Sequence, residues 1–336
     1  MKILHYLKQL LFLILGLGIF LYLLKSQPQE SIMILRNTRL SGLFLLIIAA
    51  LLVYIMAGIA MVFFIRTFDP HFPFLRGIKI EFLSLLMENL TIGVVGKGTQ
   101  MILLHRQKLT WEQSICCIGF DFISFQFTTF LFSVMVFSDA FLKTQFAAEL
   151  PAVLMGFIGD VAPLIGAGLV LYMPGISRIL HYVEAKIAIR PKRLKLTTIR
   201  NGLRTLKQER DMMHQPKRIA LVLSANFIRI LLRHILPMIA MYALCVPIPV
   251  ESIIHLFVAS IFIELMISIV PITGKHGIAE SAFLLIYSVL LPTGSAVGVM
   301  LLWRLAVYYI PTFFAIIVFL LSPEITWQSL HQKRAD

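Results

Sequence analysis

The sequence predicts an all-α polytopic membrane protein, and its composition, its long apolar runs and two broken segments support that class. Of 336 residues, 59% are hydrophobic and 14% are charged, which excludes an ordinary soluble domain. At about 20 apolar residues per crossing, the chain has room for roughly seven to nine membrane elements. We therefore expect a single membrane domain over residues 1–336, with about six full transmembrane helices and two broken re-entrant hairpins.

The charge distribution and the positions of the cysteines limit the functions that the sequence allows. A net charge of +13 would suggest nucleic acid in a soluble protein, but here the positive residues lie mostly between apolar runs. There they set orientation and meet anionic headgroups, so no nucleic-acid partner is expected. Cys116, Cys117 and Cys245 lie in apolar runs without metal-ligand or disulfide spacing. We expect no metal, no cofactor and no catalytic cluster.

The chain before the basic loop contains four long apolar runs. The run at residues 10–24 follows Lys2 and Lys8 like a signal peptide, but no small-x-small cleavage pattern follows it. We interpret it as a retained first span. The other three runs are predicted to cross the bilayer, and they are residues 43–65, 115–137 and 152–173.

Residues 78–104 are apolar but broken. The 3-4-3 spacing of Glu81, Ser84, Glu88 and Thr91 puts these side chains on one helical face. Three glycines around Lys97 are then expected to break the helix, because glycine turns where a β-carbon would clash. They are Gly93, Gly96 and Gly98. A polar stripe that ends in such a break favours one arm of a re-entrant hairpin over a straight span with a kink.

The longest polar stretch, residues 177–218, orients the chain. It holds twelve of the 30 Lys and Arg residues against three acids, so we place it in the cytoplasm, touching anionic lipid. Residues 219–246 then cross outward, and residues 297–321 return. Both termini are therefore expected in the cytoplasm.

The same orientation predicts an inverted repeat. The segment 253–291 must enter and leave from outside, whereas 78–104 enters and leaves from the cytoplasm. Broken segments that enter from opposite faces are typical of inverted-topology transporters, whose binding site lies where the breaks meet. We expect residues 43–173 and 219–321 to be the two halves.

The second break, within residues 270–280, resembles the first. Gly274 and Gly277 enclose Lys275 and His276, and Glu280 follows them. A helix that restarts after glycine presents free N–H groups and a positive dipole end, which attract phosphate or carboxylate. Neither break has the Gly-x-x-x-x-Gly-Lys-Ser/Thr spacing or the preceding strand of a phosphate loop, so we reject a nucleotide site.

Charged residues within the apolar runs complete the predicted ligand site. Arg229 and Arg233 share a helical face with Asn226, and Arg304 forms an i,i+4 pair with Tyr308. Near a helix end, such arginines would instead snorkel to the interface. The predicted substrate-binding residues are Lys97, Arg229, Arg233, Lys275, His276, Glu280, Arg304 and Tyr308.

Three acids are expected to balance these cations: Glu88, Asp121 and Glu264. Asp121 is a candidate partner of Arg304, because the two residues follow their respective breaks at similar distances. A structural salt bridge and a role in ligand binding both stay open for that pair. Burying net positive charge is costly, so the cavity should be hydrated or occupied.

The motif Pro271-Ile-Thr-Gly-Lys-His-Gly-Ile-Ala-Glu280, followed by Trp303-Arg304 and a downstream Tyr and Pro, resembles the membrane domain of lysylphosphatidylglycerol synthase/flippase proteins. That family has Pro-x-Pro-Gly-Gly-x-Gly-x-x-Glu, an apolar hairpin, and Tyr-Arg with a downstream Tyr and Pro. Its pattern at the first break is Thr-Pro-Gly-x-x-Gly-Glu-x-x-Arg. Thr91, Gly93 and Gly96 match this pattern, whereas Ile92, Lys97 and Gln100 replace its proline, glutamate and arginine.

In two-domain relatives, the membrane part is thought to move aminoacylated phospholipid between leaflets, while a soluble domain attaches the amino acid. Because the chain stops at Asp336, the resemblance implies a stand-alone lipid translocator, or flippase, of the bacterial inner membrane. A lysine in each break favours an anionic or modified phospholipid, or a lipid-linked phosphate, as its partner. A polytopic lipid or glycan transferase, a lipid-binding regulator and a homo-oligomer stay open.

Overall fold

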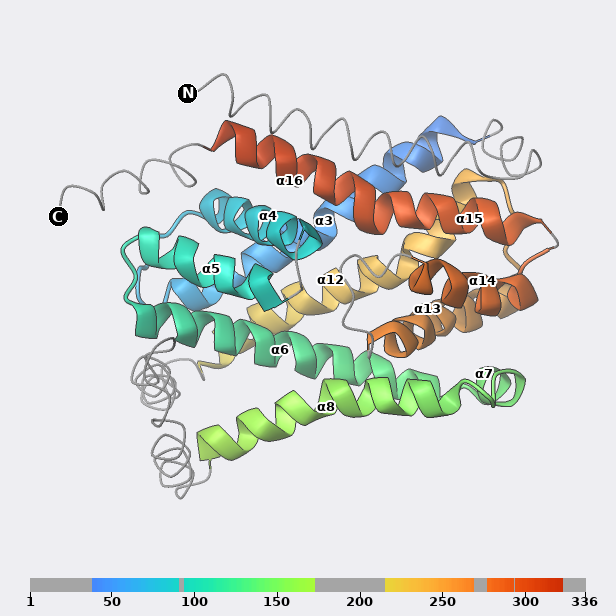
Figure 1. Ribbon diagram of the computed structural model, residues 1–336, viewed down its shortest axis with the longest axis horizontal. Coiled ribbons are helices and arrows are strands. Elements are labelled where there is room, and N and C mark those ends of the chain that lie inside the picture. The colour runs from blue at the N-terminus through green and yellow to red at the C-terminus, as the bar shows by residue number, and fades with distance from the viewer. Residues whose placement is uncertain (1–37, 91–93, 173–214, 269–276, 293, 323–336) are drawn as a thin grey trace.

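The computed structural model describes residues 38–90, 94–172, 215–268, 277–292 and 294–322, and all regular secondary structure in these ranges is helical (Figure 1). Six segments are long and apolar enough to cross a membrane. They are Leu40–Ile65, Trp111–Ser138, Leu150–Leu169, Pro216–Ala243, Val250–Ser268 and Ser295–Leu321. The chain is thus an all-α integral membrane protein, as its composition predicts.

Helices α3 (Leu40–Ile65) and α12 (Pro216–Ala243) form an extensive antiparallel pair. The Arg39 N–H donates to the Ala243 carbonyl oxygen at 2.8 Å at one end of the pair. At the other end, Arg218 Nη1 donates to Thr67 Oγ1 at 2.5 Å. A Cβ on Gly42 would lie 2.5 Å from the Ala243 Cα, so glycine permits this backbone approach. Small residues stabilise membrane helix pairs in this way, because lipid supplies little hydrophobic force between helices.

Helices α4 (Phe74–Leu90) and α5 (Val94–Arg106) pack against each other as an antiparallel hairpin (Figure 1). The Ser84 hydroxyl donates to the Gly96 carbonyl oxygen at 2.8 Å and ties the two arms together near the break. The start of α4 and the end of α5 line one cavity, so this hairpin opens at the end of the bundle where α12 begins.

The prediction that Gly96 and Gly98 break the helix is wrong, because both lie inside α5. Gly96 serves close packing instead: its Cβ would lie 3.0 Å from the Glu88 Cβ and 3.1 Å from the Ser84 carbonyl oxygen. A Cβ on Gly98 would meet nothing within 4 Å. Gly93 lies outside the described residues.

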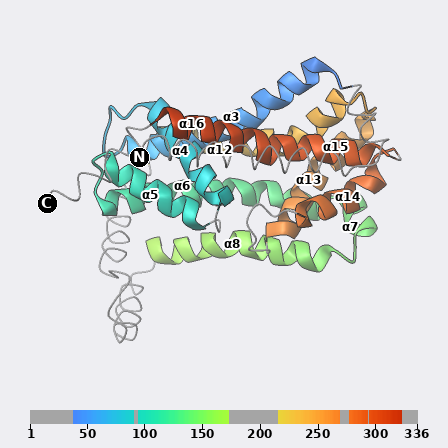
Figure 2. The ribbon, with the colours of Figure 1, turned by 45° about the horizontal axis from the view of Figure 1, so that its top comes forward.

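Helices α13 (Ile253–Ser268) and α14 (Ile278–Leu290) form a second antiparallel hairpin, in which the Tyr287 hydroxyl donates to the Leu256 carbonyl oxygen at 2.8 Å. Figures 1 and 2 show the two hairpins at opposite ends of the molecule. Gly277 precedes α14 with a φ of +79°, a conformation that glycine adopts readily. The backbone conformation at the start of α14 therefore favours glycine at this position.

The turn and helix Val250–Ser268 are long and apolar enough to span a membrane, although the sequence predicts only a re-entrant arm there. Apolar length alone allows either a full crossing or a re-entrant arm for α13. Helix α14, which returns antiparallel to α13, is compatible with both. That either hairpin enters and leaves through one face of the bilayer stays a prediction.

Helix α6 (Trp111–Ser138) begins with a capping box, in which Thr110 and Gln113 satisfy each other's backbone N–H groups. A short helix, α7 (Ala140–Gln145), connects it to α8 (Leu150–Tyr172). Helix α8 crosses α13 closely, because a Cβ on Gly156 would lie 2.0 Å from the Leu265 carbonyl oxygen.

The last span runs through α15 (Ser295–Arg304), a π-helical turn (Leu305–Tyr309) and α16 (Ile310–Leu321). Pro311 has no N–H to donate to the Val307 carbonyl, which accepts from the Tyr54 hydroxyl at 3.4 Å instead. Asn89 Nδ2 donates to Thr312 Oγ1 at 2.7 Å, so the end of α4 is tied to the same region.

The predicted crossings in the described ranges correspond to α3, α6, α8, α12 and α15 to α16, with small shifts at their ends. Helix α12 begins at Pro216, so Lys217 and Arg218 belong to a helix and not to the basic loop. The expected first span at residues 10–24 and loop residues 177–214 lie outside the described residues.

Candidate functional site

A cluster of polar side chains lies where α4, α5, α6 and α12 meet. Lys97 Nζ on α5 lies 3.3 Å from Asp121 Oδ2 on α6. The lysine side chain is 39% exposed, whereas the aspartate side chain is 3% exposed. Lys97 therefore bridges a buried carboxylate and the outside of the helix bundle.

Glu81 on α4 connects this cluster to α12. Its carboxylate accepts a hydrogen bond from Gln100 Nε2, and its Oε1 atom lies 3.8 Å from Arg229 Nη2. The Arg229 guanidinium also stacks over the Phe125 ring, 4.3 Å from its centroid. Both side chains are largely buried, so each is the other's neighbour for charge compensation.

Four polar atoms of this cluster are buried and make no hydrogen bond within the described structure: Gln100 Oε1, Asp121 Oδ1, Asn226 Oδ1 and Arg229 Nε. The amide of Asn226 does donate, to Ser124 Oγ at 3.1 Å. Leaving a buried polar atom unpaired costs about 1–3 kcal/mol, so such atoms are uncommon in native proteins. Four of them together indicate a place where polar groups of water or a ligand are received.

A further ion pair joins α14 to α15. Arg304 Nε lies 2.6 Å from Glu280 Oε1, and the guanidinium lies 5.5 Å from the centroid of the Tyr308 ring. Asp121 is therefore not the partner of Arg304, because it is paired with Lys97. The sequence suggests Asp121 by its spacing, whereas the packing of α14 on α15 brings Glu280 to Arg304.

Another ion pair joins α12 to α13. Arg233 Nη2 lies 2.7 Å from Glu264 Oε1, with side chains 35% and 27% exposed. His234 Nδ1 and Ser260 Oγ lie 2.9 Å apart beside this pair, and His234 Nε2 lies 3.7 Å from Glu264 Oε2.

Each predicted ligand cation in the described ranges thus has an acidic neighbour, and the described part of the site is charge-balanced. Asp121 and Glu264 are two of these acidic neighbours, whereas Glu88 is exposed beside Gly96. The sequence missed Glu81 and Gln100, although Glu81 lies on the polar stripe of its helix. Lys275, His276 and Gly274 lie outside the described residues.

The charged positions recur at one spacing of 183 residues: Glu81 with Glu264, Lys97 with Glu280, and Asp121 with Arg304. The bounds of α6, shifted by the same amount, coincide with those of the last span within one residue. In each half, the first hairpin arm contacts an arginine of α12, and the second arm pairs with the following span. The signs of that last pair are reversed between the halves.

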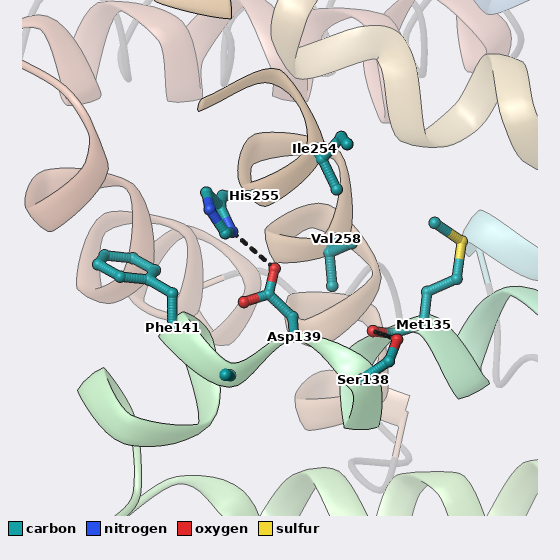
Figure 3. Close-up of a pocket in the computed structure, with 8 residues that line it drawn as sticks. Met135, Ser138, Asp139, Phe141, Ile254, His255 and Val258 are labelled. Atoms are coloured by element: carbon teal, nitrogen blue, oxygen red, sulfur yellow. Dashed lines mark hydrogen bonds and ion pairs between the residues drawn. The ribbon is translucent and has the colours of Figure 1, made fainter. Parts of the chain in front are cut away.

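A separate cavity of about 290 Å³ lies at the end of the bundle where α7 and α13 begin (Figure 3). His255 Nδ1 lies 2.7 Å from Asp139 Oδ2, and Asp139 Oδ1 accepts from the Leu142 N–H at 3.0 Å. Asp139 therefore both caps α7 and ties it to α13. The rest of the lining is mainly apolar.

In the ranges that the structure describes, no group of three or more His, Cys, Asp or Glu side chains could hold a metal ion. The chain matches no curated protein. A family model described as the lysylphosphatidylglycerol synthase TM region matches residues 9–315, which covers both hairpins and the four pairs of Lys or Arg with Asp or Glu described above. The chain is therefore a member of the lysylphosphatidylglycerol synthase transmembrane-region family, with a function related to membrane lipid.

Proposed function

We propose that the protein moves an anionic or modified phospholipid, or a lipid-linked phosphate, between the leaflets of a bacterial inner membrane. The observation that carries this proposal is the group of unsatisfied buried polar atoms on Gln100, Asp121, Asn226 and Arg229. Polar groups within helices of membrane-spanning length are expensive and usually mark the path of a polar solute. A headgroup crossing the bilayer needs such a path, while its acyl chains stay in lipid.

Lys97 is the residue best suited to receive the headgroup. Its ammonium carries three donors and reaches the outside of the bundle, whereas the Asp121 carboxylate is buried. A phosphate oxygen would replace Asp121 as its partner when the lipid binds. The pair also compensates both charges when no lipid is bound, which lowers the cost of keeping them inside the membrane.

The arrangement of the two hairpins supports transport over simple binding. They open at opposite ends of the bundle, and charged positions recur between them at one spacing. We propose that the two halves are the inverted repeats of an alternating-access device. Glu81 and Glu264, which pair with neighbouring arginines of α12, would link each hairpin to the shared central helix.

The test is lipid movement in reconstituted vesicles. Purified protein should increase the transfer of a labelled anionic phospholipid or prenyl phosphate between leaflets, measured by loss of signal to a membrane-impermeant quencher. Lys97→Ala should lower the rate, whereas Lys143→Ala, a loss of the same charge on α7, should not. No protein-dependent movement of any such lipid would overturn the proposal.

A charge exchange separates a ligand role for Lys97 from a structural one. In the double variant Lys97→Asp/Asp121→Lys, the ion pair can form again with its charges reversed. If the pair only supports the fold, both stability and transport should recover. If Lys97 receives the phosphate, stability should recover while the transport rate stays low.

A further inference from the structure

A buried histidine on α12 shares one carboxylate with Arg233. His234 is 4% exposed, and its Nε2 atom lies 3.7 Å from Glu264 Oε2 on α13. The other oxygen of this carboxylate, Oε1, lies 2.7 Å from Arg233 Nη2. The acid therefore lies between a permanent cation and a side chain that becomes a cation when it takes up a proton.

The hydrogen bonds of Ser260 indicate which ring nitrogen of His234 carries hydrogen. Ser260 Oγ lies 2.9 Å from the Phe257 carbonyl oxygen and 3.1 Å from the His234 carbonyl oxygen, and carbonyl oxygens only accept. Because the single hydroxyl hydrogen is directed to the backbone, His234 Nδ1 donates to Ser260 Oγ at 2.9 Å. Burial favours the neutral ring, and Nε2 then presents a lone pair to Glu264.

Two acceptors therefore face each other between α12 and α13. A carboxylate oxygen and an unprotonated nitrogen repel, and their separation of 3.7 Å is longer than a hydrogen bond. One proton on either atom would turn the contact into a hydrogen bond. As long as Arg233 stays in place, its guanidinium compensates the carboxylate and this proton is not required.

Arg233 is the cation of this group that can leave. Its side chain is 35% exposed, and it lies one helical turn from Arg229 of the central cluster, on the same face of α12. A guanidinium binds phosphate through two parallel hydrogen bonds. The titratable groups that act on Arg233 include Glu264 of α13, Tyr54 of α3, Glu88 of α4 and Asp160 of α8. Three of these are carboxylates, so departure of the guanidinium leaves an excess of negative charge that favours uptake of a proton.

We propose that His234 and Glu264 form a proton-binding site, which takes up one proton from water when Arg233 leaves Glu264 for the phosphate of an anionic lipid. The lipid part of this proposal rests on the function proposed above. Charge stays balanced, because His234 replaces Arg233 as the cation beside Glu264. The proton is released when Arg233 returns, so each headgroup that crosses carries one proton with it.

The proton site is tested first without lipid. In full-length protein labelled with ¹⁵N-histidine, in detergent at pH 7, NMR chemical shifts report hydrogen on each ring nitrogen, and His234→Asn identifies the signals of His234. In the wild type we expect hydrogen on Nδ1 alone. In Arg233→Gln, Nε2 should share or carry a proton, whereas Arg233→Lys, which keeps the charge, should resemble the wild type. Hydrogen on Nε2 in the wild type, or none there in Arg233→Gln, would overturn the proposal.

The coupling is tested with the unlabelled wild type, so it does not depend on how the arginine variants fold. Protein in weakly buffered detergent at pH 7 is titrated with dioctanoylphosphatidylglycerol, and a pH indicator records proton uptake. We expect one proton for each lipid bound. His234→Asn can still donate to Ser260 but cannot take up a proton, so it should bind lipid without uptake. His255→Asn, which removes a histidine at the end of the bundle, should leave uptake unchanged.

The outcomes separate this proposal from the proposed function. Lipid binding without proton uptake in the wild type, or equal uptake in His234→Asn, would overturn the coupling and leave lipid movement standing. Absence of lipid binding would count against both, whereas the NMR comparison of the wild type with Arg233→Gln would still decide whether His234 and Glu264 hold a proton.

Discussion

Glu81 and Glu264 lie 183 residues apart in the sequence, and each places its carboxylate beside an arginine of the same helix, α12. The two arginines, Arg229 and Arg233, are one helical turn apart. One helix therefore contacts both hairpins through equivalent acids, although the two contacts differ in burial. The Glu81 contact is nearly enclosed, and the Glu264 contact is about one-third exposed.

That difference predicts unequal costs for removing the two arginines. Arg229→Ala should lower the free energy of unfolding by about 3–5 kcal/mol, because it leaves the buried Glu81 carboxylate without its cation. Arg233→Ala should cost less, because the Glu264 side chain that it leaves behind is 27% exposed, whereas the Glu81 side chain is 8% exposed. Denaturant unfolding in detergent measures both values. Glu81→Gln added to Arg229→Ala should recover part of the loss, and equal costs for the two arginines would contradict this account.

Gly96 and Gly98 offer a matched pair two residues apart on one helix. Gly98→Ala should raise the free energy of unfolding by about 0.5–1 kcal/mol, because the position is helical and open. Gly96→Ala should lower it by about 1–3 kcal/mol, because its β-carbon would press on α4. Thermal unfolding of the purified variants provides the comparison. If both variants were stabilised, the close approach of α4 and α5 would be refuted.

Gly277 should be sensitive to substitution for a backbone reason. At a φ of +79°, Gly277→Ala should lower the free energy of unfolding by about 1–2 kcal/mol, and Gly277→Asn should cost less. The strain acts at the start of α14, so hydrogen exchange should increase first in that helix. Identical stability of the Ala and Asn variants would argue against the left-handed conformation.

Asp139 has two separable roles at the start of α7. Asp139→Ala removes both the cap of α7 and the partner of His255, and should lower the free energy of unfolding by about 1–2 kcal/mol. Asp139→Asn keeps an oxygen that can cap the helix and should cost less. His255→Ala removes only the link to α13. Hydrogen exchange in α7 should therefore rise in Asp139→Ala and change little in His255→Ala; a similar rise in both would contradict the capping role.

The sequence predicts the long crossings well, because apolar length is a local property that each segment carries by itself. Residues 43–65 and 115–137 contain enough apolar side chains to define α3 and α6 without reference to the rest of the chain. The charged positions that recur in the two broken segments can also be found in the sequence, because their separation is counted along the chain and does not depend on the fold.

Partner choice and glycine function could not be predicted, because both depend on which helices come together. The spacing of the sequence suggests Asp121 as the partner of Arg304, and only the packing of α14 on α15 shows that Arg304 pairs with Glu280. From the sequence alone, Gly96 is expected to break a helix. Its role becomes apparent only when α4 lies against it, with the Ser84 hydroxyl on its carbonyl.

The contact of Gly42 with Ala243 also limits how the halves can move. Axial sliding of α3 along α12 would carry a larger side chain into the space where no β-carbon fits, so translation is sterically blocked. The register of the α3–α12 pair is therefore set at this end by the absence of a β-carbon on Gly42, and at the other end by the hydrogen bond from Arg218 to Thr67.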